Sequence, residues 1–531
     1  MSGGVNNILV RNCRFLGTDV GLRFKSTRGR GGVVENIWIE DITMTEIVTD
    51  AILFDLYYNG KSAVENKDAS KAKEAKEATQ DTEIPQVDET TPQFKDIHIS
   101  NVVCDGAARA MYFNGLPEMP ISGIEINNVT INAEKGLEIK NSEKITVINA
   151  AMQGARASEA MTMSEISRCP DAKDLDFLRG KFKWNYTPGL ELKAFLDVAQ
   201  KYEREDIIEY VEKWYDEGID ENGLPQGYKK ENYTLDHICP ARTLFQLYDL
   251  TGKEKYRKTI EVIKSQIDSQ PRVEAGAFWH KNAYPHQVWL DGVYMAEPFY
   301  AEYAVRFLKG KAQKKAFEDI LNEFEIAWEK TYDAKTGLLR HAWDESKEQA
   351  WADKTTGQSQ HCWGRALGWY VMAAVEILDI LPDNTKGRDT LIKHIEDIFN
   401  ILPEYADKES GVWYQVLDCP GREGNYLEAT SSAMFSYALL KAVRKGYVGA
   451  DKKDYAIELY NRVYRQFITF DGKGLMNLTK CCAVGGLGGK NNRMGDFDYY
   501  LSEPIRDNDA KGIGPFIWAS LETETLEMES L

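Results

Sequence analysis

One acid in the middle of the chain stands out because aromatic and aliphatic residues surround it. It is Asp291, in the segment YPHQVWLDGVYMAEPF (284–299). Apolar neighbours raise the pKa of a carboxyl group by desolvation, so that a protonated fraction remains near neutral pH for general acid–base chemistry. A second acid, Asp236, lies in YTLDHICPAR (233–242). Taken singly, each acid can equally be the cap of a helix.

Three later segments also mix polar and aromatic residues, namely GLLRHAWD (337–344), WADKTTGQSQHCWGRALGWY (351–370) and WYQVLDCPGREGNYLEATSSAM (413–434). Each has a structural alternative, since a histidine can be buried and satisfied, a tryptophan can belong to the core and an arginine can pair with a helix acid. Together they favour a site, because loops rarely carry so many Trp, His and Asp residues for packing alone. We expect one cleft to gather the side chains of Asp236, Asp291, His341, Trp351, Trp363 and Arg365.

From about residue 165 the apolar residues recur with the period of an amphipathic α-helix. Ten segments follow this pattern, from ELKAFLDVAQKY (191–202) to KKDYAIELYNRVYRQF (452–467), and they come in pairs separated by loops rich in Gly, Pro and Asn. Sequential helix pairs form either a superhelical solenoid or a closed (α/α) toroid. Long aromatic loops such as 341–370 favour the toroid, whose loops surround a central cleft.

The first 150 residues repeat a different unit, a short strand followed by an Asn or Asp turn, as in NIWIED (36–41), DIHISN (96–101) and GIEINN (123–128). The repeats start roughly 20 to 30 residues apart, which is typical of a stacked solenoid, and Asn at equivalent positions can form turn hydrogen bonds or ladders in a parallel β-helix. A β-sandwich with Asn turns is the alternative. The charged segment 61–92 interrupts the repeat and is predicted to be a solvated loop or a frayed helix.

The composition is that of a soluble globular protein, with 43% hydrophobic and 28% charged residues. A formal net charge of −18 argues against nucleic-acid or anionic-membrane partners. The eight cysteines form no CxxC pair, and no apolar run reaches transmembrane length. We therefore predict a cytoplasmic protein with reduced thiols if Met1 is the true start, and a periplasmic or secreted one otherwise. The glycine-rich AVGGLGGKNN (483–492) lies outside any strand-turn-helix pattern and is predicted to be a mobile loop.

The helical half resembles glycoside hydrolase family 105, the unsaturated rhamnogalacturonyl hydrolases. The resemblance covers nearly the whole half and rests on LDH (235–237), WLDGVYMAEPF (289–299), RHAWD (340–344), HCWGRALGWY (361–370), YLEATSSAMFSYAL (426–439) and KGIGPFIWASLE (511–522). It implies an (α/α)6 barrel over residues 165–531, with no metal and no other cofactor.

The resemblance also implies a mechanism. Substrates of that family carry a double bond between carbons 4 and 5 of a terminal uronate, and hydration of this enol ether releases the neighbouring sugar. One acid can then do what most glycosidases divide between two. By the match Asp291 is that acid and returns as the base toward water, while Asp236 orients water or sugar hydroxyls.

The remaining matched residues are expected to bind the substrate. We expect stacking faces from Trp351 and Trp363, a guanidinium for the uronate carboxylate from Arg365, and further contacts from Trp289, His286 and His341.

The first half, residues 1–155, resembles the C-terminal coils of glycoside hydrolase family 28, the polygalacturonase-like β-helices. Arg23-Phe24-Lys25 stands at the position of that family's Arg-Ile-Lys motif, so Arg23 and Lys25 are expected to hold a uronate. The family's catalytic aspartates lie upstream of this motif, so we expect no polygalacturonase activity. A right-handed parallel β-helix that starts here exposes the end of its stack. We expect the helical domain or a second subunit to cover that end, unless the chain belongs to a longer fusion.

These observations predict two domains and an enzyme that removes 4,5-unsaturated galacturonic acid from the non-reducing end of rhamnogalacturonan or pectin oligosaccharides. Two alternatives stay open. An epimerase on another (α/α) barrel would need two facing histidines, for which His341 and His361 are the available pair. The other alternative is a non-catalytic protein that binds pectin oligosaccharides.

Overall fold

The computed structural model describes residues 3–57, 84–153, 156–471 and 473–530. It has two compact units, which confirms the two-domain prediction. Unit 1 comprises Met1–Arg156 and Phe467–Asn477, and unit 2 comprises Ala157–Gln466 and Leu478–Leu531. Residues 61–83 of the charged segment lie outside the described residues, so the loop predicted there is not assessed.

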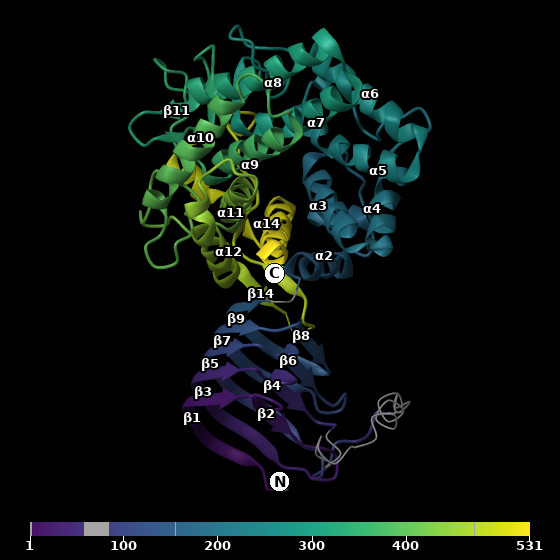
Figure 1. Ribbon diagram of the computed structural model, residues 1–531, viewed down its shortest axis with the longest axis vertical. Helices are drawn as coiled ribbons and strands as arrows, with labels where there is room; N and C mark the ends of the chain where they lie inside the picture. Colours follow the sequence, from purple (N-terminus) through teal and green to yellow (C-terminus); the bar gives the residue numbers. More distant parts are fainter. Residues whose placement is uncertain (1–2, 58–83, 154–155, 472, 531) are drawn as a thin grey trace. The chain divides into compact units, whose positions relative to one another are not determined.

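Unit 1 is a stack of parallel strands (Figure 1). The larger sheet has the order β1-β3-β5-β7-β9-β14-β15 and the smaller sheet the order β2-β4-β6-β8. The larger sheet contains β1 (Val5–Leu16), β3 (Val33–Thr45), β5 (Gln93–Asp105), β7 (Ile121–Asn132), β9 (Ser142–Gln153), β14 (Ile468–Phe470) and β15 (Met476–Leu478). The smaller contains β2 (Leu22–Lys25), β4 (Asp50–Asp55), β6 (Arg109–Asn114) and β8 (Lys135–Lys140). Strands β1 to β9 pair in parallel from coil to coil, which confirms the β-helix and excludes a β-sandwich.

The turns of this stack explain its repeated Asn and Asp residues. Asn128 Nδ2 donates to Asn101 Oδ1 at 2.7 Å, and Asn101 Nδ2 donates to Asp41 Oδ1 at 2.9 Å. All three residues have φ between 55° and 57°, the left-handed region that Asn and Asp tolerate better than most residues. The predicted Asn ladder is therefore present, with one aspartate in it.

A short segment from the helical half of the sequence completes the larger sheet. Strand β14 pairs antiparallel with β9, with Phe470 opposite Val147, and Phe470 packs on the apolar core of unit 1. At the other edge of the sheet lies β1, on which Leu9 and Leu16 are 55% and 63% exposed. Strands β14 and β15 carry little signal in the sequence, since they directly follow a long helical pattern and are three residues each.

Unit 2 is a closed ring of helix pairs (Figure 1). The inner helices are α3 (Tyr186–Tyr202), α5 (Thr243–Thr251), α7 (Leu290–Phe307), α9 (Gly364–Ile380), α11 (Ala429–Arg444) and α14 (Ala510–Ser530). The outer helices are α4 (Glu205–Gly218), α6 (Glu254–Ser269), α8 (Gly310–Thr331), α10 (Arg388–Ile401) and α12 (Lys453–Phe467), and α2 (Ala157–Arg168) packs on α14. Helix α3 contacts α14, and contacts then run through α11, α9 and α7 to the turn η4 (Cys239–Arg242), which contacts α3 again. This closure confirms the (α/α)6 barrel and excludes the solenoid.

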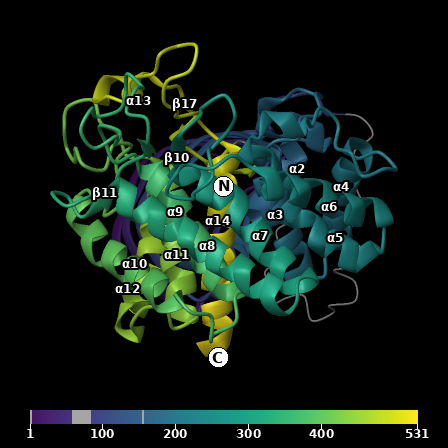
Figure 2. The same ribbon diagram turned by 90° about the horizontal axis from the view of Figure 1, so that it is seen from above.

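The sequence of each helix fits its layer. Every residue of α9 from Gly364 to Leu378 is buried, as expected of a helix that is apolar on all sides, whereas the outer helices are amphipathic. Figure 2 shows β10 (Gln287–Trp289), α13 (Phe497–Ser502) and β17 (Ile505–Arg506) at the end of the helices opposite the C-terminus of α14. In the described part of the chain, no helix has the length and apolarity needed to cross a membrane.

Candidate active site

The two predicted acids meet in one cavity of about 320 Å³ in unit 2, which we call the Asp291 cavity. Asp291 lies in the first turn of α7, and Asp236 lies in the short turn η3 (Leu235–His237). The other residues of the wall are Asp176, Lys183, Asn185, Tyr186, Thr187, His280, Lys281, Tyr284, Trp289, Met295, Ala483, Val484, Gly485, Gly486, Arg493, Arg506 and Lys511. Several distant segments thus form a single site.

Asp291 lies against His341. The Nε2 atom of His341 is 3.3 Å from Asp291 Oδ2, and its Nδ1 is 2.8 Å from the Tyr500 hydroxyl. Burial raises the pKa of Tyr500 well above its ordinary value, so this hydroxyl stays protonated and can donate to Nδ1. The imidazole proton then resides on Nε2, where it faces Asp291. Pairing of Trp289 with Ala342 in the ladder between β10 and β13 (Ala342–Asp344) fixes the two chain segments side by side.

The pKa of Asp291 lies below its ordinary value, so the predicted direction was wrong. Burial by itself would raise this pKa, but the hydrogen bond to His341 and electrostatic interactions with His341, His280 and Arg365 outweigh it. These three side chains come from other segments, so the apolar sequence neighbours of Asp291 gave no sign of them. Asp291 is therefore ionised when the cavity holds no ligand.

Asp236 is also ionised. Its Oδ2 accepts a hydrogen bond from Lys281 Nζ at 3.0 Å, and its Oδ1 is 3.6 Å from His280 Nε2. Burial opposes the charge, but Lys281 and His280 lower the pKa of Asp236 to about 2. Burial in turn lowers the pKa of His280 to about 4, so this histidine is neutral at physiological pH. Asp236 thus offers hydrogen-bond acceptors but no proton.

The tryptophans near the cavity are already covered. His280 and Tyr284 stack on Trp289 with ring centroids 4.8 and 5.2 Å away, and Trp289 is only 5% exposed. The Trp363 ring carries the Arg365 guanidinium at 4.6 Å and packs on Tyr500. Trp289 lines the cavity without a free ring face, and the stacking role of Trp363 stays a prediction.

Three other predicted residues lie outside the cavity wall. Trp351 is buried in a small apolar cluster with Trp289 and Leu487. Arg365 is buried and donates from Nη1 to the Cys482 carbonyl at 2.5 Å. His286 has a half-exposed side chain whose Nδ1 is 3.6 Å from Glu345. Their proposed substrate contacts stay predictions.

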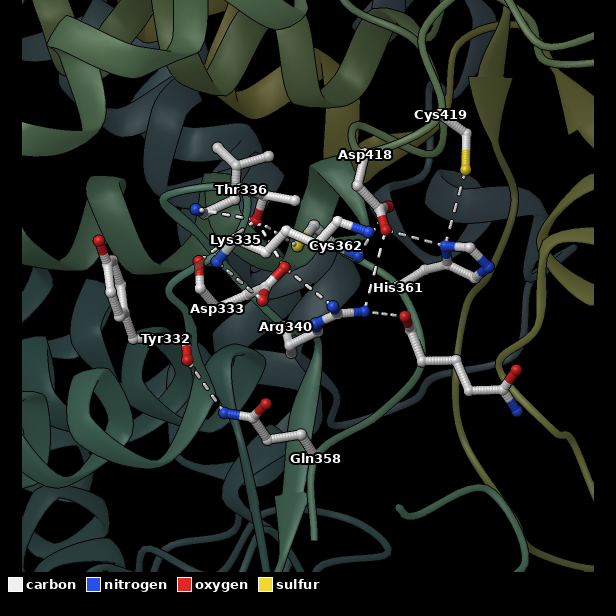
Figure 3. A network of polar contacts seen from close by, with 12 residues as sticks. Tyr332, Asp333, Lys335, Thr336, Arg340, Gln358, His361, Cys362, Asp418 and Cys419 are labelled. Atoms are coloured by element: carbon white, nitrogen blue, oxygen red, sulfur yellow. Dashed lines mark hydrogen bonds and ion pairs between the residues drawn. The ribbon is translucent and has the colours of Figure 1, made fainter. Parts of the chain in front are cut away.

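His361 belongs to a separate polar network (Figure 3). Its Nδ1 is 2.9 Å from Asp418 Oδ2 and 3.7 Å from Cys419 Sγ. These three side chains have the donor types of a metal site, but the Arg340 guanidinium 3.9 Å from Asp418 already supplies a positive charge. Neither His341 nor His361 is part of the cavity wall. His341 lies against Asp291, whereas His361 pairs with Asp418, so the two do not form the facing pair that an epimerase requires.

The glycine-rich segment forms part of the wall, whereas the sequence analysis assigned it to a mobile loop. A Cβ atom on Gly485 would lie 2.4 Å from the Trp363 ring, and one on Gly486 would lie 2.4 Å from Arg493 Nη1. Glycine is therefore favoured at 485, where the chain passes against the Trp363 ring, and at 486 it leaves the Arg493 guanidinium in place.

Arg23 and Lys25 are in unit 1, on exposed positions of β2. In the register of the smaller sheet Arg23 lies beside Leu53 and Lys25 beside Asp55. The structure does not place them in the Asp291 cavity.

A second cavity, of about 410 Å³, lies among the C-terminal halves of the inner helices, and we call it the Glu376 cavity. Each acid in its wall has a cationic partner. Arg242 pairs with Glu376, Lys193 with Asp197 at 2.7 Å, Lys441 with Asp379 at 3.0 Å, Arg306 with Glu302, and Arg444 with Glu522 at 2.5 Å. Its charges are thus neutralised within the protein.

The sequence analysis missed several residues of the site. Tyr284 opens the segment 284–299 that surrounds Asp291, and His280 and Lys281 lie just before it, so their types carried a signal. Tyr500 and Arg493 come from the C-terminal region, where no spacing in the sequence links them to Asp291.

Comparison with known proteins gives independent matches for both halves. The sequence pattern of Glycosyl Hydrolase Family 88 matches residues 157–527, and that of Glycosyl hydrolases family 28 matches residues 2–153. Protein Atu3128 of Agrobacterium fabrum is 37% identical over 235 residues, which are 43% of this chain and 98% of that protein. Unsaturated rhamnogalacturonyl hydrolase YesR of Bacillus subtilis is 28% identical over 270 residues, 49% of this chain and 71% of YesR. A solved glycoside hydrolase from family 105 of C. acetobutylicum is 44% identical, with a TM-score of 0.66, and the match covers 70% of this chain and 99% of that structure.

Proposed function

Because the chain belongs to glycosyl hydrolase family 88, we propose that it removes a 4,5-unsaturated galacturonate from the non-reducing end of rhamnogalacturonan or pectin oligosaccharides. The similarity to YesR, an unsaturated rhamnogalacturonyl hydrolase, and to the family 105 structure supports a glycosidase that acts on unsaturated uronides. The observation that carries the proposal is a single cavity in which one carboxylate faces a histidine and a second is held ionised by a lysine.

The reaction is a hydration. Asp291 in its protonated form gives its proton to carbon 4 of the enol ether, and the ring oxygen stabilises the positive charge that develops at carbon 5. Water adds to carbon 5 and returns a proton to Asp291. The resulting hemiketal opens by cleavage of the bond from carbon 5 to the ring oxygen, which leaves a ketone. The hemiacetal at carbon 1 then releases the neighbouring sugar and becomes an aldehyde.

Binding of the substrate raises the pKa of Asp291, so that this carboxylate takes up from solvent the proton that the scheme requires. Asp291 is ionised in the empty cavity because His341, His280 and Arg365 lower its pKa. A bound uronate brings a negative charge and displaces water, and both changes raise the pKa of a nearby carboxyl group. Asp236 remains ionised and orients water or sugar hydroxyls. The buried Thr187 Oγ1 and His280 Nδ1 have no hydrogen-bond partner among the described residues and can serve the same hydroxyls.

The test uses unsaturated galacturonyl-rhamnose and the ultraviolet absorbance of its double bond, which is conjugated with the carboxylate. Wild type should remove this absorbance, and Asp291→Asn should not. Loss at equal rates in both would keep the reaction and discard Asp291 as its acid. Persistence of the absorbance in both, with folding confirmed by circular dichroism, would reject the proposal for this substrate.

The β-helix unit supports pectin as the source of the substrate by its match to family 28. Cytoplasmic location, and covering of the exposed edge at β1 by another surface or a second copy, stay predictions.

A further inference from the structure

We infer that Arg493, rather than Arg365, binds a uronate carboxylate of the substrate in the Asp291 cavity. The inference rests on the proposed function, since it names the residue that recognises the acid group of that substrate.

Five cationic side chains line the Asp291 cavity, and three of them are already neutralised. Lys281 pairs with Asp236 at 3.0 Å, Arg506 with Asp176 at 2.6 Å, and Lys511 with Asp509 at 2.8 Å. The other two, Lys183 and Arg493, form no ion pair with any described residue. An anionic ligand therefore finds its counter-charge at one of these two.

Arg493 is the better prepared of the two. It is half-buried, whereas Lys183 is exposed and can be solvated by water. Its Nε donates to the Gly488 carbonyl at 3.1 Å, and its Nη2 donates to the Tyr284 hydroxyl at 3.0 Å. Both acceptors are neutral, so they fix the guanidinium without removing its charge. Nη1 donates to no described residue and keeps its two protons for a ligand.

The glycine-rich segment shapes the space beside this nitrogen. A Cβ atom at Gly486 would lie 2.4 Å from Arg493 Nη1, so a side chain there would occupy the position of a ligand or displace the guanidinium. Tyr284, which accepts the hydrogen bond from Nη2, stacks on Trp289 two residues before Asp291. These contacts tie Arg493 to the same wall that carries the acid.

Arg365 differs in each of these respects. It is 1% exposed, donates to the Cys482 carbonyl and lies outside the cavity wall. A carboxylate could reach it only if the surrounding side chains moved. Its charge acts instead on Asp291, whose pKa it helps to lower.

The experiment compares Arg493→Gln with wild type on unsaturated galacturonyl-rhamnose and on the uncharged methyl ester of the same disaccharide. A charge-assisted hydrogen bond to a carboxylate corresponds to about a 10- to 100-fold effect. We expect kcat/KM to fall by that factor on the acid and by less than about threefold on the ester, and Arg493→Lys to restore part of the loss. The matched control is Arg422→Gln, because Arg422 packs over Phe497 outside the cavity wall and should leave both substrates unaffected.

A tetrasaccharide with a second, saturated galacturonate separates two sources of the carboxylate. A loss on the disaccharide assigns Arg493 to the unsaturated residue, whereas a loss on the tetrasaccharide alone assigns it to the inner uronate. Two results would overturn the inference. One is that Arg493→Gln loses as much kcat/KM on the ester as on the acid with both the disaccharide and the tetrasaccharide, and the other is that it loses none on either substrate.

A binding measurement separates failure of this inference from failure of the proposed function. Calorimetry with galacturonic acid and with galactose needs no turnover. If wild type hydrates neither substrate, the proposed function fails, and the inference is then decided by binding. A loss of tenfold or more in affinity for galacturonic acid in Arg493→Gln, with none for galactose, supports it, and equal affinities reject it.

Discussion

Two cavities in the ring of helices differ in how their charges are balanced, and the Glu376 cavity, the larger of these two, is the less suited to chemistry. In the Glu376 cavity every acid of the wall has a cation beside it. Glu376, for example, pairs with Arg242, and Asp379 pairs with Lys441. In the Asp291 cavity the reactive carboxylate has His341 as its ion-pair partner instead of a lysine or arginine, and Arg493 lacks a counter-ion among the described residues. Both cavities hold buried charge in the same scaffold, but only one leaves part of that charge for a ligand.

The difference gives each cavity its own expected response to mutation. Where the protein itself neutralises a buried charge, removal of one partner leaves the other uncompensated and lowers the stability of the fold. Where a ligand is meant to complete the charge pattern, removal lowers activity and leaves the fold intact. A substitution in the Glu376 cavity that lowered activity without lowering stability, or one in the Asp291 cavity that did the reverse, would contradict the comparison.

The largest expected effect is that of Asp291→Asn on turnover. The amide keeps the size of the side chain but has no proton to give to carbon 4, so we expect kcat to fall by about 10³-fold or more. Melting temperature, measured by calorimetry, should change by only a few degrees. Asp379→Asn is the matched control in the Glu376 cavity and should retain kcat. Activity in Asp291→Asn above a tenth of the wild-type value would assign the acid to another residue.

The next effect concerns stability and belongs to the Glu376 cavity. Glu376→Gln leaves Arg242 buried without its counter-ion, and we expect the free energy of unfolding to fall by about 3 kcal/mol. Urea denaturation followed by tryptophan fluorescence measures this change. The kcat of the folded protein should stay within about twofold of wild type. A hundredfold loss of kcat with unchanged stability would mean that this cavity takes part in the reaction.

A smaller effect should be visible in the pH profiles of kcat and kcat/KM, where a shift of one pH unit changes the rate about tenfold. Only protonated Asp291 can donate a proton, and its pKa in the free enzyme is below the ordinary value, so kcat/KM should fall as pH rises. The bound uronate raises this pKa, so the descending limb of kcat should lie about one pH unit above that of kcat/KM.

The substitution His341→Gln sharpens the same test. It removes an interaction that lowers the pKa of Asp291, so it should move the descending limb of kcat/KM toward higher pH. If the descending limb of kcat/KM stays at the same pH in this variant, a group other than Asp291 determines its position.

The sequence could predict what repeats or what lies close together in the chain. The alternation of strands with Asn turns favoured a β-helix, and the helical period with its long aromatic loops favoured a toroid, which the resemblance to family 105 specified as an (α/α)6 barrel. The segment WLDGVY placed Asp291 at the start of a helix. It could not give the sign of the pKa shift, because that depends on the hydrogen bond to His341 and on electrostatic interactions with His280 and Arg365. Arg493 escaped prediction for the same reason. Its contact with Tyr284 joins residues 209 positions apart.

The two units offer a last comparison, with the smallest expected effect. The Asp291 cavity is walled by residues of unit 2, whereas Arg23 and Lys25 lie on an exposed sheet of unit 1. Exposed charges contribute little to the binding of a small ligand and more to that of a long polyanion. The double variant Arg23→Ala/Lys25→Ala should therefore keep kcat/KM on unsaturated galacturonyl-rhamnose within about twofold.

The same variant should migrate faster than wild type through a native gel that contains polygalacturonate, and added salt should abolish the difference. Arg11→Ala/Arg14→Ala removes the same charge from β1 of the other sheet and serves as the control, because both double variants gain the same mobility in a gel without polymer and only Arg23→Ala/Lys25→Ala should gain more when polygalacturonate is present. A tenfold loss of disaccharide turnover in the first double variant would contradict the division of labour, because it would require Arg23 or Lys25 to act on a substrate that fits within the wall of unit 2. Equal mobility of the two double variants would show that total charge, rather than the position of Arg23 and Lys25, governs retention of the polymer.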